Sequence, residues 1–156
     1  MDVIDRKILD ILQADASVPV ATIAEKVGLS AAPCWRRIKR LEDEGVIMRR
    51  VALVDRRKAN VPMTLFVSVS TTRHAARWLD EFRRAIADIS EIVEAWRLTG
   101  EVDYLLRIVV PDIDAYDAVY KRLISRLEFA DVSSAIAMEE LKFTTVVPTD
   151  YLLRER

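Results

Sequence analysis

The sequence predicts a two-domain α+β protein. Apolar residues recur at helical spacing in three short segments of residues 1–60, whereas residues 61–156 alternate between β-branched and helical stretches. The 156 residues suffice for one large or two small domains. Hydrophobic residues make up 51% and charged residues 31% of the chain, so it can bury a core and is neither disordered nor fibrous.

Several other classes of protein are excluded by composition. No apolar run approaches the roughly 20 residues that cross a bilayer, and the charged start does not match a signal peptide, so we expect a cytoplasmic protein that contacts no membrane. The single cysteine, Cys34, and the single histidine, His74, cannot complete a four-ligand zinc site, and we expect no metal. Cys34 is expected to pack in a core, with a redox role as the alternative, and His74 is expected to face solvent.

The first sixty residues predict three short helices. Asp2 or Asp5 can begin the first helix, which ends by Pro19. A second helix runs from about Val20 to Val27, and Gly28 can end it in a left-handed conformation. The apolar stripes of these two helices contain Ile4, Ile8, Leu9, Ile11 and Leu12, followed by Ile23, Ala24 and Val27.

A third helix begins after Ser30 and separates charged from apolar residues. Ser30 is expected to cap the amide of Ala32, because Pro33 in the first turn has no N–H. At 100° per residue, one arc of this helix carries four cations, which are Arg36, Arg37, Lys39 and Arg40. The residues expected to pack against the other helices lie on the opposite arc and are Cys34, Trp35, Ile38 and Leu41.

Basic residues are concentrated in this first domain. Up to Asn60 there are twelve Lys and Arg against nine Asp and Glu, a net +3, and the rest of the chain carries −4. The segment VIMRRVALVD, residues 46–55, predicts two short strands or a strand and a linker, with the domain boundary near Asn60 to Pro62. Residues 1–60 therefore predict a winged helix-turn-helix domain, with the helix-turn-helix at about 20–39, that binds double-stranded DNA. The alternative is a solvated basic helix in a three-helix cap.

The order of elements changes after residue 61. The expected elements are a strand over 63–71, a helix over 75–89, strands over 92–100 and 102–110, a helix from Asp112 or Asp114, and a strand over 132–141. This βαββαβ order predicts a ferredoxin-like domain, in which a four-stranded antiparallel sheet carries both helices on one face. The other face needs cover, which we expect from partner subunits.

Four segments together resemble one family. They are IDRKILDILQ, GLSAAPCWRRIKRLEDEGVI, LTGEVDYLLRIVVPDIDAY and AIAMEELKFTT, and they are similar to the Lrp/AsnC family of bacterial and archaeal transcription regulators. The match covers essentially the whole chain and includes the GxxDY turn at Gly100, Asp103 and Tyr104. One departure is Ala31–Ala32, where the family more often has proline or a polar pair. The DNA-binding residues that we expect are Ser30, Ala31, Ala32, Arg36, Arg37, Lys39 and Arg40.

For residues 61–156, the resemblance implies an effector-binding and oligomerisation domain in which an amino acid binds between dimers. The turn before the third strand is expected to hold the ligand through Leu98, Thr99, Gly100, Asp103 and Tyr104. On the last strand, Ser133 and Ser134 would add hydroxyls and Ile136 and Met138 an apolar wall. Asp103 can pair with an α-ammonium. The alternative is a tight β-turn in which Asp103 only satisfies local amides.

The resemblance implies a DNA-binding regulator and no enzyme. It is closest to a proteobacterial subgroup that includes a cysteine-responsive regulator, which makes cysteine one candidate effector. We expect self-association to a dimer or an octamer, allosteric control by the amino acid, no cofactor, and a location at the bacterial nucleoid. Two alternatives differ in class. One is an architectural protein that binds DNA without sensing a ligand, and the other is a siroheme decarboxylase, which needs more histidines than His74.

Overall fold

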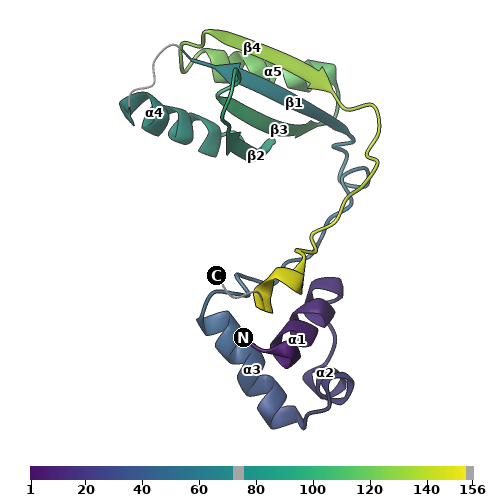
Figure 1. Ribbon diagram of the computed structural model, residues 1–156. Coiled ribbons are helices and arrows are strands. Elements are labelled where there is room, and N and C mark those ends of the chain that lie inside the picture. The colour runs from purple at the N-terminus through teal and green to yellow at the C-terminus, as the bar shows by residue number, and fades with distance from the viewer. Residues whose placement is uncertain (72–75, 154–156) are drawn as a thin grey trace. The chain divides into compact units, whose positions relative to one another are not determined.

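Two compact units make up the chain in the computed structural model, which describes residues 1–71 and 76–153 (Figure 1). One unit is Met1–Ala52 with Lys142–Arg156, and the other is Leu53–Leu141. These ranges differ from the predicted division at residue 60. The segment before Pro62 belongs with the sheet because Arg56 donates hydrogen bonds to Thr64 and, at 3.0 Å, to Glu140. We call the two parts the helical unit and the sheet unit.

The helical unit contains α1 (Val3–Ala14), α2 (Val20–Val27) and α3 (Ala31–Asp43), which confirms the three predicted helices. Asp2 caps α1, since its carboxylate accepts from the amides of Ile4 and Asp5 at 2.9 Å. Asp5 completes the cap by accepting from the Asp2 amide at 2.9 Å. Gly28 ends α2 with a φ of 74°, the left-handed conformation that glycine adopts without strain.

A small apolar core holds the three helices together. Its buried members are Ile8, Leu9, Leu12, Ile23, Ala24, Val27, Cys34, Ile38 and Leu41. Cys34 is buried as predicted, and burial raises the pKa of its thiol, which keeps it in the less reactive neutral form. Ser30 occupies the N-cap position of α3, but the predicted side-chain hydrogen bond to Ala32 is wrong, because the Ser30 side chain makes no capping bond. Its carbonyl accepts from the Cys34 amide instead.

The predicted strands of the wing are also wrong. Residues 46–54 contain no strand and follow an irregular path after α3. The apolar side chains that suggested the alternation are exposed, and they are Val46, Met48, Val51, Leu53 and Val54. A two-stranded hairpin is at most marginal in water unless one face packs against a core, and these residues have no such face.

The C-terminal segment packs on α1, a contact that the sequence did not predict. It ends in a short 3₁₀ helix, η1 (Thr149–Leu153). Thr149 donates a hydrogen bond to Asp10 at 2.6 Å, and Gln13 exchanges two hydrogen bonds with the backbone of Val147. Leu152 packs against the core of the helical unit. The two ends of the chain therefore belong to the same compact unit.

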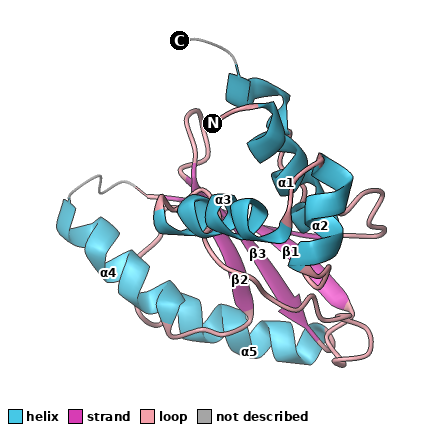
Figure 2. Cartoon of the chain, turned by 90° about the horizontal axis from the view of Figure 1, so that it is seen from below, coloured by secondary structure: helices cyan, strands magenta, loops and turns pink. Residues whose placement is uncertain are grey.

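The sheet unit has the predicted βαββαβ order. Its elements are β1 (Met63–Ser70), α4 (Ala76–Ala87), β2 (Ile92–Arg97), β3 (Tyr104–Val110), α5 (Ile113–Ile124) and β4 (Asp131–Ile136). The strand order is β2-β3-β1-β4, and every neighbouring pair is antiparallel. Both helices lie along one face of the sheet (Figure 2).

Alternation along the strands gives the sheet one covered and one uncovered face. Leu65, Val67 and Val69 of β1 point toward the helices and are fully buried. They pack with Trp78 and Phe82 of α4 and with residues of α5 and β3. Trp78 is thus a core residue. The intervening side chains, described below, face away from the helices.

Candidate DNA-binding helix and effector site

The cationic arc of α3 divides into two pairs with different surroundings. Arg36 and Lys39 are exposed, and Lys39 bonds only to Asp43 one turn later, at 2.8 Å. Within the described part of the chain, Arg36 forms no ion pair. Ser30, Ala31 and Ala32, at the start of the same helix, are exposed as well. These residues form a continuous polar and small-residue surface along the first half of α3.

Arg37 and Arg40, in contrast, turn back toward α1 and pair with Asp5. The Asp5 carboxylate is only 1% exposed and lies 2.8 Å from Arg37 Nη1 and 2.7 Å from Arg40 Nη2. Arg37 also reaches Asp2, at 2.7 Å. Two of the four predicted DNA-contacting cations are therefore engaged in joining α3 to α1. Sequence spacing placed all four cations in one DNA-contacting group. It could not separate Arg37 and Arg40, because their partner Asp5 lies on another helix, more than thirty residues earlier.

Electrostatics at this cluster favours the charged carboxylates. Burial by itself would raise the pKa of Asp5, but the hydrogen bonds from Arg37 and from the Asp2 amide, with the charge of Arg40, hold that pKa below its ordinary value. The amide of Asp5 and the guanidinium of Arg37 likewise lower the pKa of Asp2. The two carboxylates in turn raise the pKa of Arg37. The lowered pKa values keep the Asp2 and Asp5 carboxylates ionised near neutral pH.

Trp35 does not pack as predicted. Its side chain is 55% exposed, although the helical wheel placed it with the apolar residues. The apolar face of α3 is narrow, because its buried residues are Cys34, Ile38 and Leu41. Trp35 lies beyond the edge of that face, next to the exposed surface that Arg36 and Lys39 share. The wheel failed because it gives the spacing of residues but not the width of the packed face.

The predicted effector turn is closed by backbone and side-chain hydrogen bonds. The Leu98 amide donates to the Asp103 carbonyl at 2.8 Å, and Gly100 sits between them with a φ of 116°. The Asp103 carboxylate accepts from the Thr71 amide at 2.8 Å, and the Asp103 amide donates to Val69 at 3.1 Å. Asp103 thus fastens the turn to the end of β1.

Two more of the predicted effector residues face the helices. Tyr104 is buried, and its ring centroid lies 4.6 Å from that of Phe82. Ser134 pairs with Val67 across β1 and β4, on the covered face, where its hydroxyl hydrogen-bonds that of Tyr116. A hollow of about 390 Å³ lies at this edge and is lined by Ile113, Tyr116, Asp117, Tyr120, Val132 and Ser134. Ser133, the preceding residue, pairs with Ser68 and points to the uncovered face, because successive strand residues alternate.

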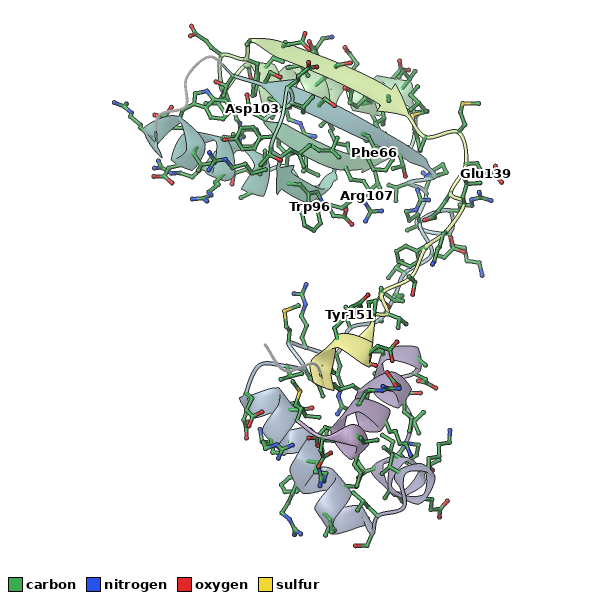
Figure 3. All side chains as sticks on the ribbon, in the orientation of Figure 1. Phe66, Trp96, Asp103, Arg107, Glu139 and Tyr151 are labelled. Carbon is green, nitrogen blue, oxygen red and sulfur yellow. The ribbon has the colours of Figure 1, made fainter. Side chains whose placement is uncertain are left out.

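The predicted effector residues are spread between opposite ends of the sheet. Tyr104 pairs with Val69 beside the turn, whereas Ile136 pairs with Leu65, four residues farther along β1 and about 13 Å away. Met138 follows Ile136 and is 94% exposed. Figure 3 shows Asp103 at one end of the unit and Glu139, next to Met138, at the other. A single chain therefore does not bring the predicted effector residues into one pocket.

The uncovered sheet face carries an aromatic and ion-paired surface. Phe66 is 41% and Trp96 58% exposed, and Figure 3 shows both near Arg107 on the same side of the sheet. Arg107 forms an ion pair with Glu94 at 2.5 Å across β3 and β2. Exposed aromatic rings on a sheet face, with a charged pair beside them, are typical of an interface between subunits.

Comparison with known proteins identifies the family. A model of the AsnC-type helix-turn-helix domain matches residues 1–42, and one of the Lrp/AsnC ligand binding domain matches residues 64–147. The chain belongs to the Lrp/AsnC family. It is a DNA-binding transcription regulator with a ligand-binding domain, in a family that is not enzymatic. The resemblance and the fold class that the sequence predicted are confirmed.

Individual Lrp/AsnC proteins match over nearly the full length. The regulator Zrp of Zymomonas mobilis is 44% identical over 152 residues, which cover 97% of this chain and 99% of Zrp. The crystal structure of an AsnC family regulator from Agrobacterium tumefaciens is 56% identical with a TM-score of 0.95, covering 98% of this chain and all of the other. The NMB0573/L-Met complex from Neisseria meningitidis is 34% identical with a TM-score of 0.92, covering 98% and 99%.

The described residues contain neither a group of metal ligands nor a membrane-spanning helix. Among residues 1–71 and 76–153, no group of three or more His, Cys, Asp or Glu side chains is placed to hold a metal ion. No helix in that part of the chain is both long and apolar enough to span a bilayer. His74, expected to face solvent, lies outside the described residues.

Proposed function

We propose that this Lrp/AsnC protein binds specific duplex DNA through the exposed side of α3, and that a small amino acid controls this binding. The observation that carries the proposal is the surface around Arg36, which has cations and small side chains but no ion-pair partner for Arg36 in the described chain. An α-helix fits the major groove of DNA, where arginine can bind phosphates or guanine edges. We propose that the protein does so at the nucleoid, in the bacterial cytoplasm.

The proposal gives the four cations of α3 different roles. Arg36 and Lys39 contact DNA, together with the exposed Ser30, Ala31 and Ala32 at the start of the helix. Arg37 and Arg40 fix the position of α3 on α1 through the buried Asp5. Removing Arg36 should therefore weaken DNA binding without loss of stability, whereas removing Arg37 should leave a buried carboxylate with fewer partners and destabilise the helical unit.

We propose a dimer as the basic assembly, with the uncovered sheet faces of two copies packed together around Phe66 and Trp96. Two copies present two α3 helices to half-sites about one helical turn apart. The effector site is then completed between copies, since the turn at Gly100 and the residues Ile136 and Met138 lie apart in one chain. Closure of dimers into an octamer would place such a site between neighbouring dimers.

For the effector we propose a small amino acid held near Leu98, Thr99, Gly100 and Asp103 of one copy, with Ser133, Ile136 and Met138 of another. The similar Neisseria protein forms a complex with L-methionine, and the sequence resembles a cysteine-responsive subgroup. An amino acid can alter DNA binding only if it binds one assembly or helix spacing better than another. Cysteine and methionine are therefore the first compounds to test.

Fluorescence anisotropy on the duplex upstream of the protein's own gene, at a stated salt concentration, tests the proposal. Arg36→Ala should weaken binding about tenfold, which corresponds to about 1.4 kcal/mol. Arg84→Ala is the matched control, since Arg84 is an exposed arginine on α4 in the sheet unit. Equal affinity of Arg36→Ala and the unmodified protein would remove the exposed side of α3 from the DNA interface.

Amino acids added singly to the same assay test the second part. A shift in affinity with cysteine or methionine, accompanied by a change in mass by light scattering, supports control through assembly. Binding to every duplex alike, with no response to any amino acid, would instead favour the architectural function. DNA binding by α3 and its control by an amino acid can fail separately, because the preference for a DNA sequence is measured without any amino acid present.

A further inference from the structure

Trp35 is the largest side chain on the exposed side of α3. Its indole makes no ring contact and no hydrogen bond within the described residues. Trp78 provides the contrast in the same chain, because it stacks on Phe82 at 5.1 Å and its Nε1 donates to the Glu128 carbonyl at 3.3 Å. Trp35 therefore contributes little to the core of the helical unit, although an aromatic side chain can bury roughly 150 to 250 Å².

The position of Trp35 on α3 aligns it with the proposed DNA-contacting residues. At 100° per residue it lies about 40° from both Ala31 and Lys39, one helical turn before and after it. Side chains of a helix lean toward its N-terminus, so the indole extends over Ala31 and Ala32. These alanines carry only methyl groups and are exposed, which leaves the ring accessible at the N-terminal half of the helix. That half of a recognition helix is the one that meets base edges.

We propose that Trp35 is a specificity-determining residue that packs its indole against the 5-methyl group of a thymine in the major groove. The inference rests on the proposed function of α3. Contacts to phosphates carry no sequence information, whereas the thymine methyl is the apolar group that the major groove displays and that apolar side chains read. Arg36 and Lys39 lie beside the ring, on the same side of it around the helix, and supply the charge that holds the helix to the backbone of the DNA. The indole supplies the apolar surface that these cations lack.

Selection from a pool of random duplexes is the first step of the test, with the unmodified protein and Trp35→Ala run in parallel. The unmodified protein should enrich a symmetric motif that contains a thymine in each half-site. Trp35→Ala should enrich the same motif without the preference at that thymine, because the other contacts of α3 remain. Since Trp35 is more than half exposed, the variant should keep its thermal midpoint, which is checked by circular dichroism.

Replacement of that thymine by deoxyuridine is the decisive second step, since it removes the methyl group and nothing else. The unmodified protein should bind the deoxyuridine duplex about fivefold more weakly per half-site, and Trp35→Ala should bind both duplexes equally. Trp35→Phe, which keeps an aromatic ring, should retain part of the discrimination. Arg36→Ala should bind both duplexes more weakly but keep the ratio between them. Deoxyuridine at thymines outside the motif is the internal control.

Each contrary result has a distinct meaning. If the unmodified protein selects a motif but binds thymine and deoxyuridine equally at every position, or if Trp35→Ala keeps the discrimination, the role of Trp35 is refuted and the proposed function stands. If Trp35→Ala changes only the mass of the assembly in sedimentation, the ring contacts protein, and the role is also refuted. If the unmodified protein selects no motif at all, both this inference and sequence-specific binding by α3 are refuted.

Discussion

The helical unit and the sheet unit bury different kinds of side chain. The helical unit places an ionised carboxylate, Asp5, between its helices and satisfies it with Arg37, Arg40 and the cap of α1. The sheet unit buries an apolar cluster on one face and leaves aromatic rings on the other. The comparison teaches that the helical unit joins its helices through a buried ion cluster within one chain, whereas the sheet unit is held by an apolar cluster and lacks cover for one face.

Phe82→Ala should have the largest effect on stability. Phe82 is fully buried between Trp78, Tyr104 and Phe129, and removal of its ring leaves a cavity in the sheet unit. We expect a loss of about 4 kcal/mol in the free energy of unfolding. Hydrogen exchange by mass spectrometry should show faster exchange in β1, β3 and α4 and unchanged exchange in α1 and α2. Equal loss of protection in both units would contradict their independence.

Asp5→Ala should destabilise the helical unit by about 3 kcal/mol, because it leaves Arg37 and Arg40 without their shared partner. The same experiment should now show faster exchange in α1 and α3, while β1 and β3 stay protected. Glu25→Ala, at an exposed position of α2, is the control and should cost far less. A small loss for Asp5→Ala would mean that the ion pairs do not join the helices.

Phe66→Ala should weaken self-association rather than folding. Phe66 lies on the uncovered sheet face and is too exposed to stabilise the single chain strongly. If that face forms the dimer interface, loss of the ring should cost about 2 kcal/mol of association free energy, or roughly thirtyfold in the dimer dissociation constant. Sedimentation equilibrium measures it, with the exposed Val93 as the position of a matched Val93→Ala control. Unchanged association would place the interface elsewhere.

Acid should produce the smallest change, and in the helical unit it should act through Asp5 and Asp2. The pKa of Asp5 and that of Asp2 are lowered in the folded state, so their stabilisation is present above the unfolded pKa near 3.8 and is lost as the pH falls below it toward the folded value. Thermal midpoints measured from neutrality down to about pH 4 should therefore fall only slightly and then drop more steeply. The Asp5→Asn variant cannot lose a charge at this position, so the part of the fall in thermal midpoint that comes from protonation of Asp5 should be absent.

Local patterns in the sequence were enough to predict the helices and strands of both units. The Asp2 cap, Gly28 after α2 and the strand over 63–71 depend on residues close together in the chain, and each appears in the structure as predicted. The GxxDY turn and the segment around Pro33 were enough to indicate the Lrp/AsnC family. Periodicity could not give the width of the packed face of α3, which is why Trp35 was assigned to the core.

What the sequence by itself determined is thus the order of helices and strands, the α+β class and the Lrp/AsnC membership. Only the tertiary structure decided which cations of α3 are engaged by Asp5, that residues 46–54 form no wing strands, and that the C-terminal segment packs on α1. It also separated the effector candidates at Gly100 from those at Ile136. The physical reason is that ion pairs and packing join residues far apart in the chain, and helical or strand periodicity carries no information about such distant partners.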